Sequence, residues 1–389
     1  MNASAPIQHP AGNQGTPTFI YPNKPIRFDR EELDRLLLWC CEQDVSDITF
    51  QTDRPLYLER HGVLYASTIR DIGHHEVQSI TQQIYGENGV AKLKSGGDFD
   101  VSYTIKVDRS NMKRFRVNAT SIMSGGTDGI QITIRVLPEV PPTVEQIAVE
   151  PEIQDNAFPH KGVIYVTGVT GSGKSTLLAS LIRKWLEDPR KTGKALEYSA
   201  PIEFVYDGVV WVNSCIAQTE IPKQLPNFAA GVRNSLRRHP SLTIVGESRD
   251  NETISGGCEL ASTGHPVFTT AHTSSVSNTV RRLVMTYPAE ERASATINLI
   301  ENMHMIINQT LVPATKGGRV ALREFLVFNE EIRREYLKVR PEEWAELTDE
   351  FMKTRGRSMV DSAREAHRLG RIEDDVLARY ETLELRDVA

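Results

Sequence analysis

Residues Gly168 to Ser175 fit the pattern G-x-x-x-x-G-K-[ST] at every required position, and this is the strongest chemical signal in the sequence. Glycines let backbone N–H groups converge on phosphate oxygens, and the start of a following helix adds the positive end of its dipole. Lys174 would reach the β- and γ-phosphates, and the Ser175 hydroxyl would bind Mg²⁺. The segment therefore predicts a site for ATP with Mg²⁺. The residues expected to contact the nucleotide here are Gly168, Thr170, Gly171, Ser172, Gly173, Lys174, Ser175 and Thr176.

The elements on either side of this loop support the same interpretation. Residues 162–167 are apolar and largely β-branched, which predicts a buried strand, and residues 176–185 have the apolar spacing of a helix. The order strand, glycine loop, helix is the context that this motif requires. The alternative, a glycine-rich turn without a ligand, does not account for these flanks.

Hydrolysis of a bound triphosphate also needs a carboxylate near the phosphates. Residues 241–246 predict a strand that delivers Glu247 to the carboxyl edge of a sheet, where ligands usually bind. Glu247 could polarise the attacking water or hold Mg²⁺ through its hydration shell. Glu203 follows the strand after the phosphate-loop helix, and two such acids could divide the roles of base and metal positioning. For each, a solvated surface glutamate is the alternative.

Two histidines flank the predicted strand 266–270. Because the spacing of His265 and His272 is odd, the rings would point to opposite faces of an extended segment, which weakens a shared metal site. A polar sensor of the γ-phosphate or of a subunit contact is the preferred interpretation, and a structural histidine stays open for each ring.

Arginines could supply the positive charge that a phosphoryl transition state needs. Arg114, Arg116 and Arg135 fall on predicted strands before residue 137, and Arg233, Arg237 and Arg281 fall on predicted helices after it. From composition alone, any of them is more often a solvated arginine.

Composition restricts the class of protein. The chain has 389 residues, enough for two domains, with 39% hydrophobic and 25% charged residues, as in ordinary soluble proteins. The net charge of −6 argues against a dedicated nucleic-acid binder. No apolar run approaches the roughly 20 residues that span a bilayer, and the N-terminus lacks a signal pattern. Four cysteines without paired spacing suit a reducing cytoplasm. We expect a cytoplasmic protein that could be recruited to a membrane.

Changes along the chain predict five segments. Residues 1–26 predict a flexible N-terminus, 27–137 a small α+β domain, 138–155 a proline-rich linker or hinge, 156–340 an α/β domain with a doubly wound parallel sheet, and 341–389 a helical, highly charged C-terminal segment. In the first domain we expect helices over 29–41 and 76–85 and strands over 46–50, 55–64, 98–107, 113–120 and 129–136, with a tight turn at His61-Gly62. In the second we expect strands over 162–167, 195–198, 241–246 and 266–270.

Together, the boxes around the phosphate loop, Glu203, Glu247 and His265–His272 resemble the hexameric secretion and pilus ATPases of type II and type IV secretion and of pilus retraction. The residues 46–48, the hairpin 55–62 and the segment 114–118 look like this family's PAS-like N-terminal domain. The resemblance extends over roughly residues 30–330.

The resemblance implies a RecA-like P-loop ATPase domain after the PAS-like domain, and ATP bound between the two domains of a six-membered ring. It implies that Arg114, Arg116 and Arg135 reach the phosphates, that His265 and Arg237 contact the nucleotide, and that Glu203, Glu247 and His272 act in catalysis. Partners would be inner-membrane components of a secretion system, including another ATPase, with no direct contact to nucleic acid.

Three departures point to one branch of the family. Ser199 and Ala200 stand where an acidic pair usually precedes the proline, which leaves Glu203 as the acid of that box. Basic residues precede the Glu247 strand, where retraction motors carry acids, and the C-terminal signature of retraction motors is missing. The sequence looks most like the DotB/TraJ branch, the motors of type IVB secretion and related conjugative transfer systems. A pilus retraction or assembly motor, a P-loop kinase, a nucleic-acid translocase and a non-catalytic nucleotide-gated scaffold are the alternatives.

Overall fold

The structure is a computed structural model that describes residues 19–108, 112–137 and 140–388. It divides into two compact units, 1–137 and 138–389. Residues 1–18 of the predicted flexible N-terminus and residues 138–139 of the predicted linker lie outside the described residues. Each unit has its own sheet, and no described helix is long and apolar enough to cross a membrane.

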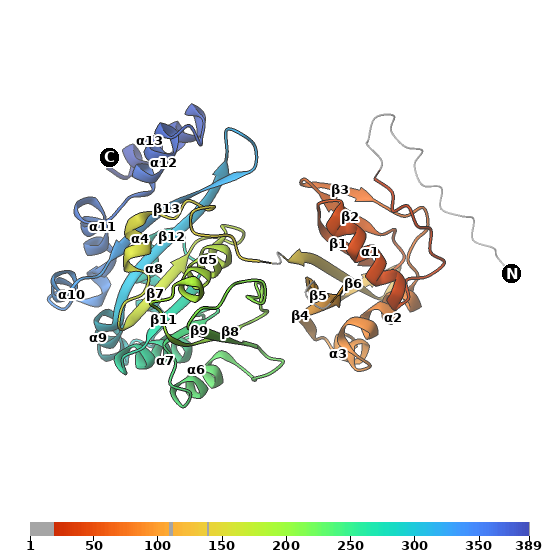
Figure 1. Ribbon diagram of the computed structural model, residues 1–389, viewed down its shortest axis with the longest axis horizontal. Helices are drawn as coiled ribbons and strands as arrows, with labels where there is room; N and C mark the ends of the chain where they lie inside the picture. Colours follow the sequence, from red (N-terminus) through yellow and green to blue (C-terminus); the bar gives the residue numbers. More distant parts are fainter. Residues whose placement is uncertain (1–18, 109–111, 138–139, 389) are drawn as a thin grey trace. The chain divides into compact units, whose positions relative to one another are not determined.

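The first unit is an antiparallel sheet covered by helices (Figure 1). The strand order is β3-β2-β1-β6-β5-β4, and every neighbouring pair is antiparallel. Side chains from the first two helices, such as Leu36 and Ile80, pack on buried strand residues such as Ile48 and Ile132. The elements are α1 (Arg30–Glu42), β1 (Val45–Gln51), β2 (Tyr57–Arg60), β3 (Val63–Ala66), α2 (His74–Tyr85), α3 (Gly89–Lys94), β4 (Asp98–Lys106), β5 (Met112–Ser124) and β6 (Thr127–Leu137).

The local predictions for this unit are confirmed, with one omission. Asp29 caps α1 by accepting a hydrogen bond from Glu32 N. His61 and Gly62 have φ angles of 51° and 77° between β2 and β3, as a two-residue hairpin turn requires. The short helix α3 was not predicted, because its six residues are too few to show helical periodicity.

The second unit is built on a seven-stranded sheet in the order β13-β12-β7-β11-β10-β8-β9 (Figure 1). All neighbours are parallel except β13, which is antiparallel to β12. The strands are β7 (Gly162–Thr167), β8 (Gly193–Ser199), β9 (Ser214–Glu220), β10 (Leu242–Val245), β11 (Pro266–Ala271), β12 (Met303–Pro313) and β13 (Arg319–Val327). The predicted parallel core is confirmed, whereas β9, β12 and β13 were not predicted.

Helices cover both faces of this sheet. Along β7, Val163 and Tyr165 pack in one hydrophobic cluster, and Ile164 and Val166 pack in another. This alternation explains why all six residues of β7 are buried. The helices are α4 (Pro151–Asn156), α5 (Lys174–Glu187), α6 (Phe228–Leu236), α7 (Asn251–Ser262), α8 (Val276–Met285), α9 (Arg292–Asn302), α10 (Glu330–Tyr336), the 3₁₀ turn η1 (Pro341–Glu343), α11 (Trp344–Thr354), α12 (Met359–Arg368) and α13 (Asp374–Val388).

The structure differs from the predicted linker 138–155 in its second half. Val144, Val149 and Ile153 are buried in the same cluster as Ile164 and Val166, and Pro151 begins α4. A proline at the first helical position is compatible with a helix, because the missing N–H would be unpaired there in any case. Residues 144–156 are therefore part of the second unit's core.

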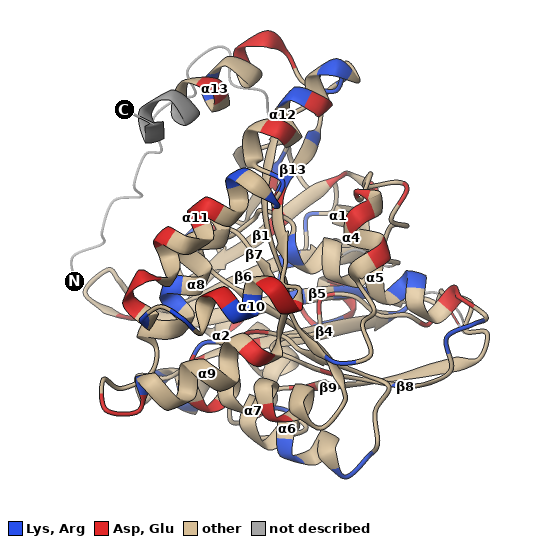
Figure 2. Ribbon diagram, turned by 90° about the vertical axis from the view of Figure 1, so that its left-hand side faces the viewer, with Lys and Arg blue, Asp and Glu red and all other residues tan. Residues whose placement is uncertain are grey.

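The C-terminal helices carry both charge signs on their exposed faces. Acidic and basic side chains are interspersed along α10, α11 and α12 (Figure 2). Some form pairs about one turn apart, such as Arg334 with Glu330 and Arg368 with Glu365. The opposite faces of α12 and α13 pack Ala363 and Val376 against Leu322 of β13. The prediction of a helical charged tail is confirmed.

Candidate nucleotide-binding site

The carboxyl ends of four parallel strands bring the predicted site together. Thr167, the last residue of β7, pairs with Ala271 of β11, and Val245 of β10 pairs with both Thr269 and Tyr198. The phosphate loop, His272, Glu247 and the segment leading to Glu203 follow these strand ends. This edge is where open α/β sheets bind ligands.

The phosphate loop needs its glycines for steric reasons. Gly168, Gly171 and Gly173 have φ angles of 144°, 79° and 82°. A Cβ at Gly168 would lie 2.3 Å from the Gln309 carbonyl oxygen. Helix α5 begins directly after Gly173, so its free N–H groups and positive dipole end face the loop.

Lys174 lies within the loop, at the first position of α5. Its side chain is nearly buried, and Nζ donates hydrogen bonds to Gly168 O at 2.8 Å and Val169 O at 3.1 Å. Burial lowers the pKa of Lys174, and the negative charges of Glu247 and Glu203 offset only part of this shift. Both predicted carboxylates are thus close enough to act electrostatically on the ammonium group that would meet the phosphates.

His272 connects this lysine to Glu247. Its Nδ1 lies 3.4 Å from Lys174 Nζ, and its Nε2 lies 3.5 Å from Glu247 Oε1. Burial, and then the positive charge of Lys174, lower the pKa of His272, which favours the neutral imidazole. Because an ammonium group only donates, Nδ1 is the acceptor and Nε2 carries the proton that faces Glu247.

Two further arginines at this edge were not predicted as site residues. Arg249 Nη2 lies 2.7 Å from Glu247 Oε2, and Arg282 Nη1 donates to the His272 carbonyl oxygen at 2.8 Å. The position of Arg249 two residues after Glu247 is a signal that sequence reasoning could have used. Nothing in the sequence links Arg282 to His272.

His265 and Arg237 do not join this group within the chain. His265 precedes β11 and His272 follows it, so about 20 Å of extended strand separates the two rings. His265 Nδ1 lies 3.2 Å from Leu260 O, and its ring lies 6.3 Å from that of His239. Arg237 caps α6 and leads into β10 from its amino end.

The three predicted arginines of the first unit share one face of its sheet. Arg114 and Arg116 alternate along β5, and Arg116 pairs directly with Arg135 of β6. The core residues Phe115 and Val117 occupy the other face. Arg116 Nε donates to Asp100 Oδ1 at 3.0 Å, and Arg135 Nε donates to Asp47 Oδ1 at 2.8 Å.

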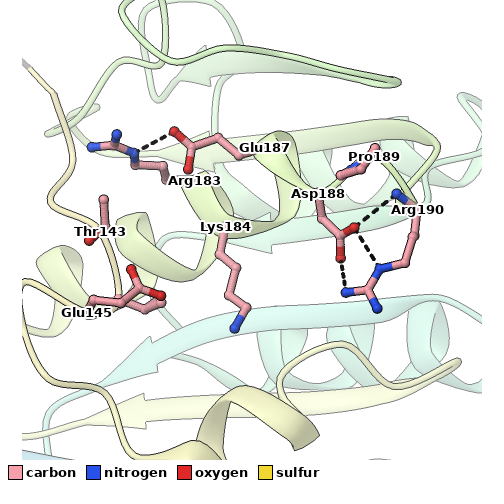
Figure 3. A pocket seen from close by; sticks show the side chains of 9 residues that line it. Thr143, Glu145, Arg183, Lys184, Glu187, Asp188, Pro189 and Arg190 are labelled. Atoms are coloured by element: carbon pink, nitrogen blue, oxygen red, sulfur yellow. Dashed lines mark hydrogen bonds and ion pairs between the residues drawn. The ribbon is translucent and has the colours of Figure 1, made fainter.

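A pocket at the opposite end of α5 has a different character (Figure 3). Its two arginines are paired with neighbouring acids, since Arg183 Nε lies 2.9 Å from Glu187 and Arg190 Nη2 lies 2.9 Å from Asp188, and Lys184 Nζ donates to Gln154 Oε1. With these internal pairs, this pocket does not resemble a phosphate site.

The sequence profile of the type II/IV secretion system protein family matches residues 99–379. The chain belongs to this family. The type IV pilus retraction ATPase PilT of Pseudomonas aeruginosa is 30% identical over 303 residues, which cover 78% of this chain and 84% of that protein. PilT is named as an ATPase, and this chain is an ATPase.

The fold comparison agrees with the sequence comparison. The crystal structure of the Legionella pneumophila ATPase DotB matches with a TM-score of 0.85 at 42% identity and covers 94% of this chain and 99% of that one. The pilus retraction motor PilT with bound ADP matches with a TM-score of 0.74 at 26% identity, covering 89% of this chain and 95% of that one. The predicted RecA-like P-loop ATPase fold and the resemblance to secretion and pilus motors, with DotB among the relatives, are confirmed.

Proposed function

We propose that this ATPase is a hexameric motor that powers a type IVB secretion or conjugative transfer apparatus. The similarity to DotB carries the proposal, because it extends over 94% of the chain at 42% identity, against 26% for the retraction motor PilT. A position in the cytoplasm, with recruitment to the inner-membrane face by other components of the apparatus, including a second ATPase, belongs to the same proposal.

The chemistry that we propose follows from the groups at the sheet edge. Lys174 exchanges its two loop carbonyls for β- and γ-phosphate oxygens when ATP binds. Glu247 orients the attacking water, while the neutral His272 donates its Nε2 proton toward Glu247 and keeps that carboxylate in place. Glu203 adds negative charge near Lys174 and assists in holding the water or the metal.

The donor set fits Mg²⁺, which prefers oxygen ligands and usually binds through few protein groups together with phosphates. Ser175 follows Lys174 in the first turn of α5, and the His272 ring connects that lysine to Glu247, at 3.4 Å from Lys174 Nζ and 3.5 Å from Glu247 Oε1. We propose that the Ser175 hydroxyl holds the ion and Glu247 holds its hydration shell. The bound ion would neutralise charge on the transferring phosphoryl group.

The first-unit arginines provide the remaining positive charge in this proposal. Arg114, Arg116 and Arg135 already face one side of their sheet, and Arg116 and Arg135 are held by acids that a nucleotide could displace. Arg237 and His265 lie away from the phosphate loop of their own chain, so we propose that they contact nucleotide or protein across a subunit boundary.

The test is steady-state phosphate release by the wild type and by Glu247→Gln, with ring size measured by light scattering on the same samples. We expect the variant to bind ATP, to form the same six-membered ring and to lose at least about a hundredfold in turnover. Glu350→Gln, an exposed glutamate on α11, is the matched control and should turn over normally. Normal turnover by Glu247→Gln would contradict the catalytic role proposed for Glu247.

Two other functions remain in competition and have their own outcomes. A type IV pilus retraction or assembly motor is favoured by the 30% identity to PilT, and restored twitching in a strain that lacks its own motor would support it. Restored effector or plasmid transfer without twitching supports the secretion motor. A nucleotide-gated scaffold, suggested by Ser199 and Ala200 where acids are usual, would bind ATP and release no phosphate in any assembly state.

A further inference from the structure

The back of the phosphate loop is held by a side chain from a distant strand. A loop that turns its N–H groups toward phosphates must turn carbonyls the other way, and these need partners. Gln309 of β12, which is buried, donates from Nε2 to Ser172 O at 2.6 Å. A Cβ at Gly173 would lie 2.8 Å from the same Nε2, so loop and glutamine are in direct contact.

A buried arginine fixes the orientation of this glutamine. Arg323 of β13 is 1% exposed, and its Nε donates to Gln309 Oε1 at 2.7 Å. Because a guanidinium group only donates, the amide oxygen must face Arg323, and the amide NH₂ group must face Ser172. The arginine therefore determines which end of the Gln309 amide meets the loop.

The two terminal nitrogens of the Arg323 guanidinium bind residues 147–150, near the start of the second unit. Arg323 Nη1 donates to Glu150 Oε2 at 3.0 Å and to Ala148 O at 3.1 Å, and Nη2 donates to Ile147 O at 3.1 Å. Burying an ion pair is costly in free energy, and apolar residues of similar volume often give equal or greater stability. The Arg323–Glu150 ion pair is therefore better explained by the orientation of Gln309 that it maintains than by a contribution to folding stability.

We propose that Gln309 is a positioning residue for the phosphate loop, and that Arg323, anchored on residues 147–150, holds Gln309 in the orientation that the loop needs. The inference rests on the nucleotide site proposed above. These buried hydrogen bonds would keep the N–H groups of the loop directed at the phosphates.

The decisive variant is Gln309→Glu, which has nearly the same shape. Its carboxylate keeps the contact with Arg323 as an ion pair, but it cannot donate to Ser172 O and places negative charge behind the loop. We expect the dissociation constant for ADP and the KM for ATP to rise about tenfold, as for one buried hydrogen bond that is lost, with a smaller change in kcat. Arg323→Lys keeps the charge beside Glu150 but loses the fork that fixes Gln309, and it should weaken ADP binding in the same direction.

A control variant separates positioning from general stability. Tyr336→Phe removes another buried hydrogen bond of the same unit, to Thr348 Oγ1 at 2.6 Å, far along the chain from the loop. It should lower the melting temperature of the nucleotide-free protein without changing the affinity for ADP. The measurements are binding of a fluorescent ADP analogue by the full chain and its melting temperature with and without ADP.

The outcomes distinguish this inference from the proposed site itself. If wild type binds ADP and Lys174→Ala does not, the nucleotide site stands. A folded Gln309→Glu protein with wild-type ADP affinity would then overturn the inference. Should Gln309→Glu fail to fold, wild-type affinity in Arg323→Lys overturns it equally. If wild type itself binds no ADP, the nucleotide site is wrong, and the positioning role is lost with it.

Discussion

Glu324 of β13 predicts a specific dependence of stability on pH. The side chain is partly buried, and its Oε1 accepts a hydrogen bond from Val276 N, at the start of α8, at 2.8 Å. The pKa of Glu324 is raised to about 7, chiefly by burial and also by the charge of Asp349, while backbone N–H groups of Val276 and Met359 partly oppose this shift. The Asp349 carboxylate meanwhile accepts a hydrogen bond from the Ser277 hydroxyl.

The magnitude follows from the two pKa values. The folded value of about 7 lies above the ordinary value of 4.5, so the folded state binds its proton more tightly than the unfolded state. The stabilisation is fully present below about pH 4.5, is lost as the pH rises toward 7, and stays lost at higher pH. The difference corresponds to roughly 3 kcal/mol of unfolding free energy at most.

Glu324→Gln replaces the acid with a neutral side chain at every pH. We expect wild type and variant to have similar unfolding free energies at pH 5, and the variant to be more stable at pH 8 by up to about 3 kcal/mol. The assay is urea unfolding at several pH values, followed by tryptophan fluorescence. Trp344, one of the four tryptophans of the chain, lies in the second unit's core beside α8 and α10. Glu350→Gln, at an exposed position, should show no such divergence. A difference between wild type and Glu324→Gln that is constant from pH 5 to pH 8 would refute the reasoning.

Two further predictions concern the phosphate loop and the partly buried His304. Gly168→Ala places a Cβ 2.3 Å from Gln309 O at a φ of 144°, so we expect loss of ADP binding by at least about tenfold, and unchanged ADP binding would contradict the steric argument. His304 Nε2 donates to Asn156 O at 2.9 Å, and burial lowers the pKa of His304. Its contribution to stability is therefore present above about pH 6.5 and falls as the pH drops below this value. His304→Gln should flatten the decline in unfolding free energy below pH 6.5, by at most about 1.4 kcal/mol per pH unit, and parallel pH curves would contradict this prediction.

The phosphate loop, Glu247 and His272 could be predicted as site residues because the sequence patterns that indicate them are local. The phosphate loop, the strand before it and the helix after it are adjacent in the chain, and Glu247 follows its own β-branched strand. The parallel order of the strands then places Glu247 and His272 at one edge. No side-chain contact had to be known in advance for this result.

The contacts of Gln309 and Arg323 behind the phosphate loop could not be predicted, because they depend on the pairing of segments that are distant in sequence. The apolar run of β12 is interrupted by Asn308 and Gln309, which in isolation favour a loop rather than a buried strand. Their burial makes sense only once β12 lies beside β7 and Asn308 donates to Thr167 Oγ1 at 3.0 Å. The buried Arg323 has the same explanation, since charged residues are rarely buried without a partner and Glu150 lies far away in sequence.

The boundary between the units shows how composition can mislead. The prolines near residue 140 indicate an extended linker, yet Val144 and Ile153 carry the apolar signal of a core segment. These few apolar residues show neither helical nor strand periodicity, so the prolines were the stronger signal in this segment.

The placement of Gln309 and Arg323 also has a consequence for the newly synthesised chain. The loop is complete once residue 175 has been made, but Gln309 lies 137 residues after its partner Ser172, and Arg323 follows later still. Chains grow at about 5–20 residues per second, so the loop exists for roughly 7 to 27 seconds before Gln309 has been synthesised. A fragment that ends before residue 309 would contain the complete nucleotide motif but neither of the two side chains that we propose to position it.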